Sequence, residues 1–188
     1  MTNAPNQLNS AKIVLGISGG IAGYKAADLA SKLTGAGATV RTVMTENACK
    51  LIMPLTLESV TRGPVYTSMW TGPDDFKIGH IQMADWADAV VVAPATANLI
   101  AKVATGICDD LLSTTLCACW NKKVLIAPAM NSNMWANPIV QRNMAIITDQ
   151  LKFKTIGPES GRLACGTTGI GRMAEPADIL EALAELLK

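Results

Sequence analysis

The sequence predicts an α/β protein of three layers, in which a Rossmann-like or flavodoxin-like parallel sheet carries helices on both faces. Short apolar runs typical of buried strands alternate along the chain with segments of helical periodicity. Hydrophobic residues make up 49% of the 188 positions, which is enough for one sizeable core. No linker or repeat interrupts the pattern, so we expect a disordered lead over residues 1–11 and a single domain over residues 12–188.

The first unit of the chain is strand, helix, strand. Residues 12–17 form an apolar run that ends in a glycine-rich turn, as a buried strand does. Helical spacing of apolar side chains begins at Ile21 and stops near Gly35, and a second strand follows over residues 39–44. A unit this short joins two parallel strands through a right-handed crossover.

The later elements follow from the same apolar periods and from turn residues. In chain order we expect two short helices within residues 47–62, a strand over 65–70, a loop over 71–79, a helix over 81–87, a strand over 89–93, a helix from Leu99, a helix to Trp120 that Asp109 or Asp110 caps, a strand over 123–127, a helix over 137–149, a strand over 153–156 and a helix from Pro176. The glycine-dense segment over residues 161–172 is predicted to be a long loop that acts as a lid or binding flap.

Composition excludes several classes of protein. The net charge is +1 and lysines and arginines form no run, which argues against nucleic acid or an anionic membrane as a partner. The five cysteines show no C-x-x-C spacing and the chain has one histidine, which argues against a metal site and a disulfide framework. The polar amino terminus and the lack of a long apolar run predict neither a signal peptide nor a membrane span, so a reducing cytoplasm is expected.

Ligands of such a sheet bind outside the carboxyl ends of its strands, so the residues there are the candidates. After the first strand, Ser18, Gly19 and Gly20 form a turn that opens a helix and offers N–H groups and a hydroxyl to a phosphate. The turn matches neither G-x-G-x-x-G nor a P-loop, and a plain structural turn is the alternative. Thr45 follows the second strand where a dinucleotide enzyme usually has an acid; a helix cap or turn is its alternative.

Two later strands end alike, each passing from a buried run into Pro-Ala and then to an asparagine. One leads from Pro94 to Asn98, and the other from Pro128 to Asn131. An asparagine side chain both donates and accepts, so it can bind the edge of a planar ligand or a carboxylate. Ordinary turn chemistry explains one such ending, whereas two favour a shared site.

Histidine and cysteine supply two further candidates. His80 is predicted at the start of a short helix, where the neutral imidazole of a general base is favoured, although a lone histidine can also be structural. Cys165 lies in the glycine-dense segment and is a candidate acid or nucleophile, with an incidental thiol as the alternative. The other cysteines, at positions 49, 108, 117 and 119, are expected to be small core residues.

Five motifs carry a resemblance to a known family. They are GISGGIA followed by Tyr24-Lys25, Gly79-His80-Ile81 before Trp86-Ala87-Asp88, PATAN at 94–98, PAMNSNMW at 128–135 and ACGTTGIGRM at 164–173. With these motifs the chain resembles the phosphopantothenoylcysteine decarboxylases of the flavin-dependent cysteine decarboxylase family over residues 12–187. One departure is Leu99, where the family has a hydroxyl, so the contact made from this position is left open.

The resemblance implies bound FMN and conversion of 4′-phospho-N-pantothenoylcysteine to 4′-phosphopantetheine and carbon dioxide, a step of coenzyme A biosynthesis. Oxidation of the substrate thiol to a thioaldehyde would supply the electron sink that a cysteine carboxylate lacks. His80 would be the base of that oxidation, Asn131 would hold the substrate carboxylate and Cys165 would protonate the ene-thiol. The implied FMN-binding residues are Ser18, Gly19, Gly20, Thr45, Pro94, Ala95, Thr96, Ala97, Asn98 and Ala129, and the implied substrate-binding residues are Asn131, Met134, Ala164 and Cys165.

The resemblance also implies partners. Family members form a homotrimer or larger assemblies of trimers, up to a homododecamer, with FMN at the subunit interface; the low charged fraction of 16% fits a covered surface. A phosphopantothenoylcysteine synthetase, fused or separate, would supply the substrate. Three alternatives remain open: a peptidyl-cysteine decarboxylase of the lantibiotic type, a flavin prenyltransferase, and a phosphatase-regulating binding subunit without enzyme activity.

Overall fold

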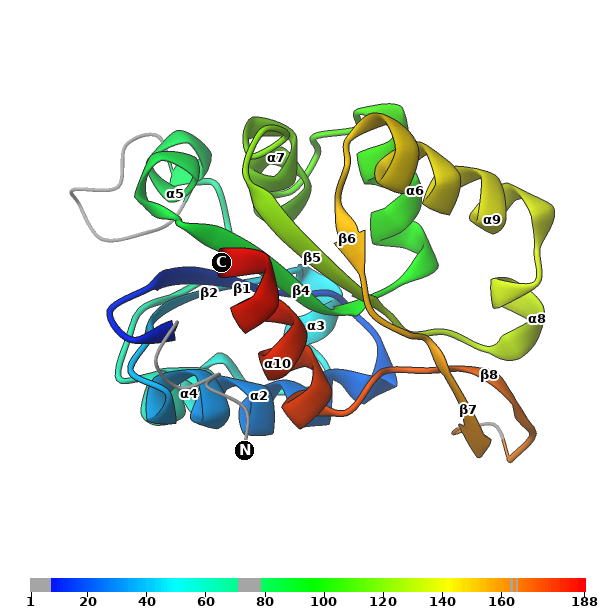
Figure 1. Cartoon of the computed structure of the whole chain (residues 1–188), viewed down its shortest axis with the longest axis horizontal. Helices are drawn as coiled ribbons and strands as arrows, with labels where there is room; N and C mark the ends of the chain where they lie inside the picture. Colours follow the sequence, from blue (N-terminus) through cyan, green and yellow to red (C-terminus); the bar gives the residue numbers. More distant parts are fainter. Residues whose placement is uncertain (1–7, 71–78, 163, 165) are drawn as a thin grey trace.

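The structure is a computed structural model that describes residues 8–70, 79–162, 164 and 166–188. Within these residues a six-stranded parallel sheet forms the centre of the molecule (Figure 1). The strands lie in the order β3-β2-β1-β4-β5-β6, which is the Rossmann order, and the direction in which strands are added reverses between β1 and β4. The strands are β1 Lys12–Ile17, β2 Thr39–Met44, β3 Val65–Tyr66, β4 Ala89–Ala95, β5 Lys123–Pro128 and β6 Lys154–Thr155.

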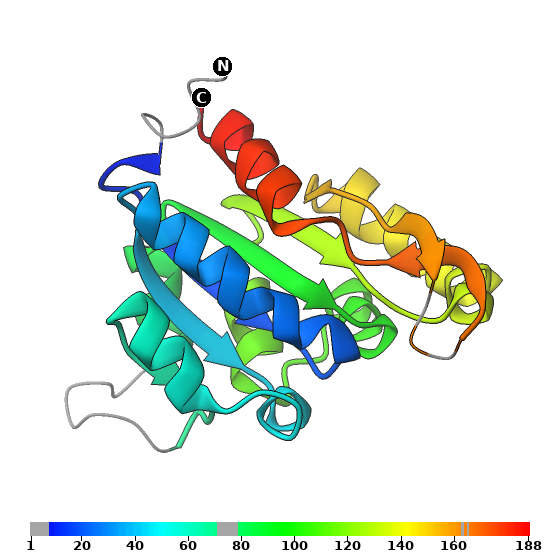
Figure 2. The ribbon, with the colours of Figure 1, turned by 90° about the horizontal axis from the view of Figure 1, so that it is seen from below.

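Helices cover both faces of the sheet, which confirms the predicted three-layer class. Figures 1 and 2 show α2, α4 and α10 on one face, whereas α5, α6, α7 and α9 pack on the other. The helical segments are η1 Ile21–Gly23, α2 Tyr24–Gly35, α3 Glu46–Cys49, α4 Pro54–Thr61, α5 Gly79–Trp86, α6 Ala97–Thr105, α7 Leu111–Ala118, α8 Ser132–Trp135, α9 Pro138–Ala145, η2 Ile146–Gln150 and α10 Pro176–Leu187.

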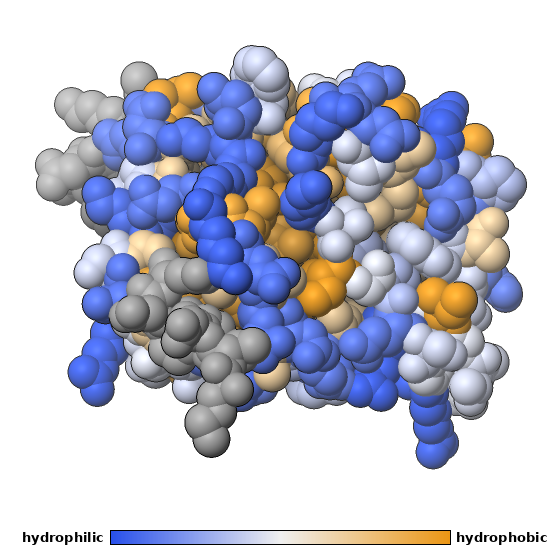
Figure 3. All heavy atoms as spheres, in the orientation of Figure 1, coloured by the Kyte–Doolittle hydropathy of each residue, from blue (hydrophilic) through white to orange (hydrophobic). Residues whose placement is uncertain are grey.

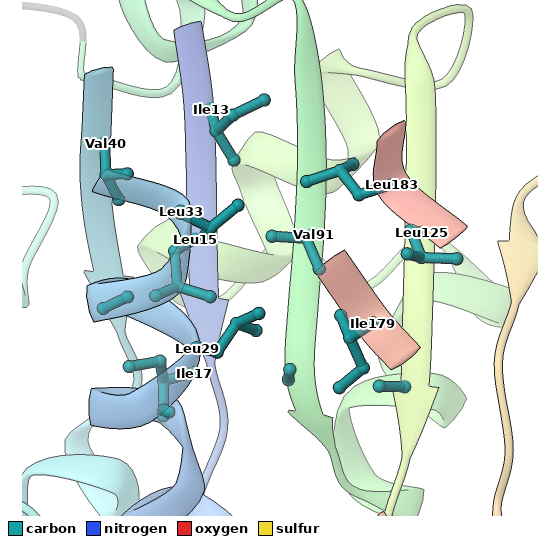
Figure 4. Packing of buried hydrophobic residues seen from close by; sticks show 14 of the residues in the cluster. Ile13, Leu15, Ile17, Leu29, Leu33, Val40, Val91, Leu125, Ile179 and Leu183 are labelled. Carbon is teal, nitrogen blue, oxygen red and sulfur yellow. The ribbon is translucent and has the colours of Figure 1, made fainter. Parts of the chain in front are cut away.

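The core explains why the strands are apolar throughout. Figure 4 shows Leu29 of α2 and Ile179 of α10 facing side chains of β1, β4 and β5, among them Leu15 and Val91, and all four of these side chains are fully buried. The neighbouring residue Val90 points to the opposite face, where it packs under α5 and α7. A strand covered on both faces buries consecutive side chains, so it reads as a continuous apolar run.

The prediction of a structureless loop over residues 161–172 is wrong at both ends of the segment. Its ends form an antiparallel hairpin of β7 Glu159–Arg162 and β8 Thr168–Arg172. Apolar alternation, the usual sign of a strand, is missing here because the hairpin lies on the surface and pairs only with itself. Glycine is required at position 171, where a side chain would collide with the carbonyl oxygen of Met130.

Several boundaries differ from the prediction. The expected strand over 65–70 is only Val65–Tyr66, and the expected helix over 137–149 ends as α9 at Ala145 before one turn of π-helix. The short helix α8 was not predicted, because four residues carry no measurable period. The predicted loop over 71–79 lies outside the described residues except for Gly79, which begins α5.

Two expectations about burial are wrong. The lead was expected to be disordered through residue 11, yet Leu8 is fully buried and Ala11 is 9% exposed, both within the core that α2 and α10 cover. Cys108 and Cys117, expected in the core, are exposed, whereas Cys119 is buried. At the edge of a helix, the sequence does not show whether a cysteine will be buried or exposed. Its exposure depends on which elements pack against that edge.

The surface is mixed in character. Figure 3 shows hydrophilic side chains over much of one face, with hydrophobic ones visible in the gaps between them. Across the part of the chain that the structure describes, no helix has both the length and the apolar character needed to cross a bilayer.

Candidate cofactor and substrate site

A pocket of about 1500 Å³ opens at the carboxyl ends of the central strands. It is lined from the turn after β1, the start of α3, the start of α6 and the segment between β5 and α8, so it lies where the strand order reverses. Single small ligands usually occupy roughly 300–1,000 Å³, so this pocket has room for two ligands side by side. The hairpin of β7 and β8 lies beyond the ends of β4 and β5 (Figure 2). Together with the first part of α2, the residues before α7 and the start of α10, it supplies the rest of the wall.

Ser18 joins the ends of β1 and β4. Its hydroxyl donates to the carbonyl oxygen of Pro94 at 2.8 Å and accepts from the N–H of Thr96 at 2.9 Å, and the residue is only 2% exposed. The hydroxyl hydrogen is therefore occupied by the protein. The sequence suggested a phosphate ligand at this position, and the structure gives Ser18 the further task of holding two strand ends together.

Thr45 and Thr96 are helix caps that also line the pocket. Each hydroxyl accepts a hydrogen bond from the helix that it precedes, Thr45 from the N–H of Ala48 at 3.2 Å and Thr96 from that of Leu99 at 3.4 Å. A hydroxyl that accepts in this way keeps its own hydrogen for a ligand. The two interpretations of Thr45, cap and ligand contact, are thus compatible. Leu99 also lines the pocket.

The turn after β1 offers N–H groups to the same space. The N–H groups of Gly19 and Ile21 make no hydrogen bond to any of the residues that the structure describes. Gly19 is required because a side chain there would collide with Asn47 at the start of α3. Backbone N–H groups at the start of a helical segment attract anions, so this turn can hold a phosphate without a cationic side chain.

The predicted box over residues 94–98 divides into two parts. Pro94 and Ala95 are buried within β4 and do not line the pocket, so they act through the backbone. The three residues that follow them, Thr96, Ala97 and Asn98, do line it. Of the box, these three residues are placed to touch a ligand directly.

Asn131 caps α8 on the side of the pocket that faces the hairpin. Its Oδ1 accepts from the N–H of Asn133 at 2.8 Å, which orients the amide. Ala129, Met134 and Ala164 line the same pocket, and Met134 is 48% exposed. The hairpin contacts this segment through a hydrogen bond of 2.9 Å from the Met130 N–H to the Gly171 carbonyl oxygen.

The structure tests the position of only one of the two remaining predicted catalytic residues. His80 is the second residue of α5, as the sequence predicted, but it does not line the pocket of its own chain. Figure 1 shows α5 at the opposite end of the molecule from α8 and the hairpin. Cys165 lies outside the described residues, so its role stays a prediction.

Charged residues on the pocket wall were not identified from the sequence. Lys102 lies 2.7 Å from a carboxylate oxygen of Asp109 and 2.7 Å from one of Asp110. Burial alone would lower the pKa of Lys102, but its hydrogen bonds to the two aspartates outweigh burial and raise it. At the hairpin end, Glu175 pairs with two cations, Lys25 and Arg172.

Lys25 is the most enclosed of these cations, with its side chain 10% exposed. Its ammonium group donates to Glu175 at 2.9 Å and to the carbonyl oxygen of Met173 at 3.4 Å. Burial and then the neighbouring Arg172 lower the pKa of Lys25. A lysine at the start of a helix is common in sequences, so no local signal separates it from a surface charge.

The chain matches one family model over its whole length and known proteins over most of it. A family model described as Flavoprotein matches residues 1–188. Coenzyme A biosynthesis bifunctional protein CoaBC of Bacillus subtilis (strain 168) is 49% identical over 174 residues, which are 93% of this chain and 42% of that protein. The chain thus spans about two fifths of the length of the curated relatives that it matches.

Solved structures share the fold closely. A PPC decarboxylase mutant complexed with pantothenoylaminoethenethiol has a TM-score of 0.85 and 34% identity, covering 93% of this chain and 97% of that one. The FMN binding protein AtHal3 has a TM-score of 0.81 and 34% identity, with 93% and 95% covered. Each of these similarities covers 93% of the chain.

Proposed function

The chain belongs to the flavoprotein family, and we propose that it uses FMN to decarboxylate 4′-phospho-N-pantothenoylcysteine to 4′-phosphopantetheine in coenzyme A biosynthesis. One observation carries the proposal: a single pocket brings Asn131 and the hairpin together with an anion-binding site at the strand ends that consists of uncharged N–H and hydroxyl groups. The first feature suits a flavin mononucleotide, and the second suits a small carboxylate beside it. The reducing cytoplasm is the compartment that fits five cysteines without a disulfide pattern.

FMN fits the residues at the strand ends. The N–H groups of Gly19 and Ile21, which bond to none of the described residues, and the hydroxyl hydrogens of Thr45 and Thr96 are donors that a phosphate and a ribityl chain can accept from. The first residue after β2 is Thr45 and not the acid that usually binds a ribose, and the acid that follows it, Glu46, pairs with Lys50, which favours a mononucleotide over NAD. When bound, FMN supplies the two-electron oxidation of the substrate thiol and the later return of the electrons.

The residues of this chain position the substrate. Asn131 holds the carboxylate with its amide N–H₂ while its Oδ1 stays on the Asn133 N–H. Met134 packs against the apolar part of the cysteine unit, and the hairpin limits the access of water. Cys165, which lies outside the described residues, is proposed to deliver a proton to the carbon of the ene-thiol.

His80 serves as the base only if another copy of the chain brings it to the pocket. In its own chain it lies away from the pocket, and its neighbour Ile81 is 44% exposed on the same helix. We therefore include a homo-oligomer in the proposal, a homotrimer or a larger assembly of trimers, with α5 of one copy completing the pocket of the next. The bifunctional relatives are longer than the part that this chain matches. We also propose that this chain works with a phosphopantothenoylcysteine synthetase, either fused to it or as a separate protein.

The test uses the purified chain with FMN and the synthetic substrate. We expect a flavin spectrum after gel filtration, release of FMN rather than FAD or NAD on heating, and formation of carbon dioxide and 4′-phosphopantetheine. A colourless protein that does not retain added FMN, or a flavoprotein that leaves this substrate unchanged, contradicts the proposal. The product mass also separates the rivals, because a peptidyl-cysteine decarboxylase stops at the ene-thiol, which has two hydrogens fewer.

Cys165→Ser tests the last proton transfer. The variant should still release carbon dioxide but accumulate the ene-thiol and reduced flavin, because the donor to carbon is missing. Cys49→Ser is the control, since this thiol is half-buried and burial raises its pKa. Normal formation of the saturated thiol by Cys165→Ser would make Cys165 a structural residue.

A further inference from the structure

Among the described residues, four cationic side chains line the pocket, and one of the four pairs with none of the described carboxylates. Lys102 pairs with two aspartates, and Lys25 and Arg172 share Glu175. Arg162 also lines the pocket, yet it forms no salt bridge or hydrogen bond with any residue that the structure describes. Its guanidinium group is therefore available to a ligand.

The hairpin holds Arg162 in a defined place. Arg162 pairs with Thr168 across the two strands, and one step further in, Gly161 pairs with Gly169. Arg172 crosses over Gly161, where a side chain would come within 3.3 Å of its Cδ and Nη1. Arg172 pairs with Glu159 at the other end of the ladder, but its side chain reaches Gly161, the residue before Arg162, and the hairpin is bonded to the segment that carries Asn131.

The charges divide the pocket into two ends. At the end near α7, Lys102 faces two carboxylates, so negative charge exceeds positive charge there. At the hairpin end, Lys25 and Arg172 share a single carboxylate and Arg162 adds a further positive charge. Asp28 also lines the pocket but pairs with Lys32, and Glu159 acts on Lys25 from outside the lining residues. An anionic group is therefore favoured at the hairpin end.

The proposed substrate has an anionic group that this end fits. It carries a carboxylate at one terminus and a phosphate at the other, and the pantothenoyl arm between them prevents Asn131 from holding both. The phosphate of FMN is accounted for at the strand ends by N–H groups and hydroxyls. A guanidinium group suits this second phosphate, because it can bind two oxygens of the dianion at once.

We propose that Arg162 binds the terminal phosphate of the substrate and so selects the phosphorylated compound, with Lys25 and Arg172 adding positive charge beside it. This inference rests on the proposed function and names the group by which the same site recognises its substrate. Arg162 is exposed, so it exchanges little hydration when the phosphate arrives. The specificity therefore comes from the hairpin, whereas the strand ends serve the cofactor.

The experiment compares two substrates in two proteins. The ratio of kcat/KM for 4′-phospho-N-pantothenoylcysteine to that for N-pantothenoylcysteine is measured for the FMN-loaded wild type and for Arg162→Met. We expect the variant to lose about 10–100-fold on the phosphorylated substrate, mainly through KM, as a charged hydrogen bond predicts. On the substrate without phosphate the change should stay within about threefold, and Arg162→Lys should recover part of the loss.

Lys154→Met is the matched control, because it removes an exposed charge from β6, a strand that does not line the pocket. It should leave the ratio unchanged. An equal loss on both substrates in Arg162→Met would mean that the residue only shapes the hairpin, and an unchanged ratio would mean that the phosphate lies elsewhere. Either result overturns the inference.

Binding of the two products provides a readout that does not need turnover. Calorimetry should show that the wild type binds 4′-phosphopantetheine about 10–100-fold more tightly than pantetheine, and that Arg162→Met removes most of this difference. Equal affinity of the wild type for both compounds contradicts the inference. A wild type that discriminates between them but does not decarboxylate the substrate contradicts the proposed function and leaves the phosphate site standing.

Discussion

The two ends of the pocket are built differently. At the strand ends, Ser18 is 2% exposed and joins β1 to β4 with two side-chain hydrogen bonds, and Thr45 and Thr96 are fixed as helix caps. At the hairpin end, Arg162 and Ile170 are exposed, and the hairpin pairs only with itself before it contacts α8. The strand ends are fixed by hydrogen bonds to several elements, whereas the hairpin is fixed mainly where it contacts the segment of α8.

This difference explains how one pocket can bind two ligands. A cofactor that stays bound benefits from donors that are already oriented, because no entropy is lost in ordering them at each turnover. A substrate that enters and leaves needs a wall that can yield, and segments with few buried contacts open at the lowest free energy. Substitutions at the two ends should therefore separate cofactor binding and stability from turnover.

The largest effect is expected from Asn131→Asp at the hairpin end. Aspartate caps a helix as well as asparagine does, so α8 should remain formed and FMN should stay bound. The new carboxylate repels the substrate carboxylate and cannot donate to it, so kcat/KM should fall at least about 100-fold, or roughly 3 kcal/mol. Flavin content by absorbance and carbon dioxide release measure the two properties on the same sample.

Asn137→Asp is the matched control for this variant. Asn137 caps α9 with the same bond, from the N–H of Ile139 to its Oδ1 at 2.8 Å, and it does not line the pocket. It should be fully active. An active, flavin-bound Asn131→Asp protein would remove Asn131 from the substrate site.

The next effect concerns the strand ends. Ser18→Ala leaves the partly buried N–H of Thr96 without its acceptor and removes the buried bond to the Pro94 carbonyl oxygen, which should lower the free energy of unfolding by about 2 kcal/mol and weaken FMN binding. Ser59→Ala is the control, because Ser59 is an exposed residue of α4 whose hydroxyl bonds only within its own helix. Urea unfolding gives the free energy of unfolding, and flavin titration gives the affinity for FMN. A Ser18→Ala protein that loses turnover but keeps normal stability and FMN affinity would contradict the different roles of the two ends.

A smaller effect is expected from Asp110→Asn on the wall near α7. Burial raises the pKa of Asp110, but hydrogen bonds from Lys102 and the Ser113 N–H outweigh it, so the pKa lies below its ordinary value. The stabilisation is therefore present above the unfolded pKa of about 3.9 and is lost as the pH falls through the lower folded pKa.

Asparagine keeps the cap and loses the charge, so the variant should be about 1 kcal/mol less stable at pH 7. Unfolding free energies measured from pH 7 downward should converge below about pH 4. Asp28→Asn, at an exposed pair with Lys32, should change stability by less than half as much. A difference that persists at low pH would mean that the carboxylate charge is not what stabilises this wall.

The smallest perturbation tests exposure around α7 with a thiol reagent. Cys117 and Cys108 are exposed, whereas Cys119 is buried and burial raises its pKa to about 11. In the native protein, Cys117 and Cys108 should react at least about tenfold faster than Cys119. Peptide mapping by mass spectrometry assigns each site, and unfolding in denaturant should equalise the rates; rapid labelling of Cys119 in the native state would show that this helix opens.

Much of the fold was predictable because its signals are local. The apolar runs that became β1, β2, β4 and β5 were identified within a few residues, and Asp110 was one of two predicted caps for α7. The strand ends were identified as the binding region, since the geometry of a parallel sheet requires it. The hairpin was missed because its strands carry no alternating apolar residues.

The layers, the strands and the chemistry of the side chains at the strand ends follow from local sequence patterns, because helical and strand periods involve neighbouring residues. What those side chains face follows from the packing of distant segments. Ser18 meets Pro94 across 76 positions of the chain, Lys25 meets Glu175 across 150, and His80 ends up away from the pocket. Such contacts depend on which strands become neighbours and how the chain crosses between them. No local pattern of residues shows which distant residues will meet.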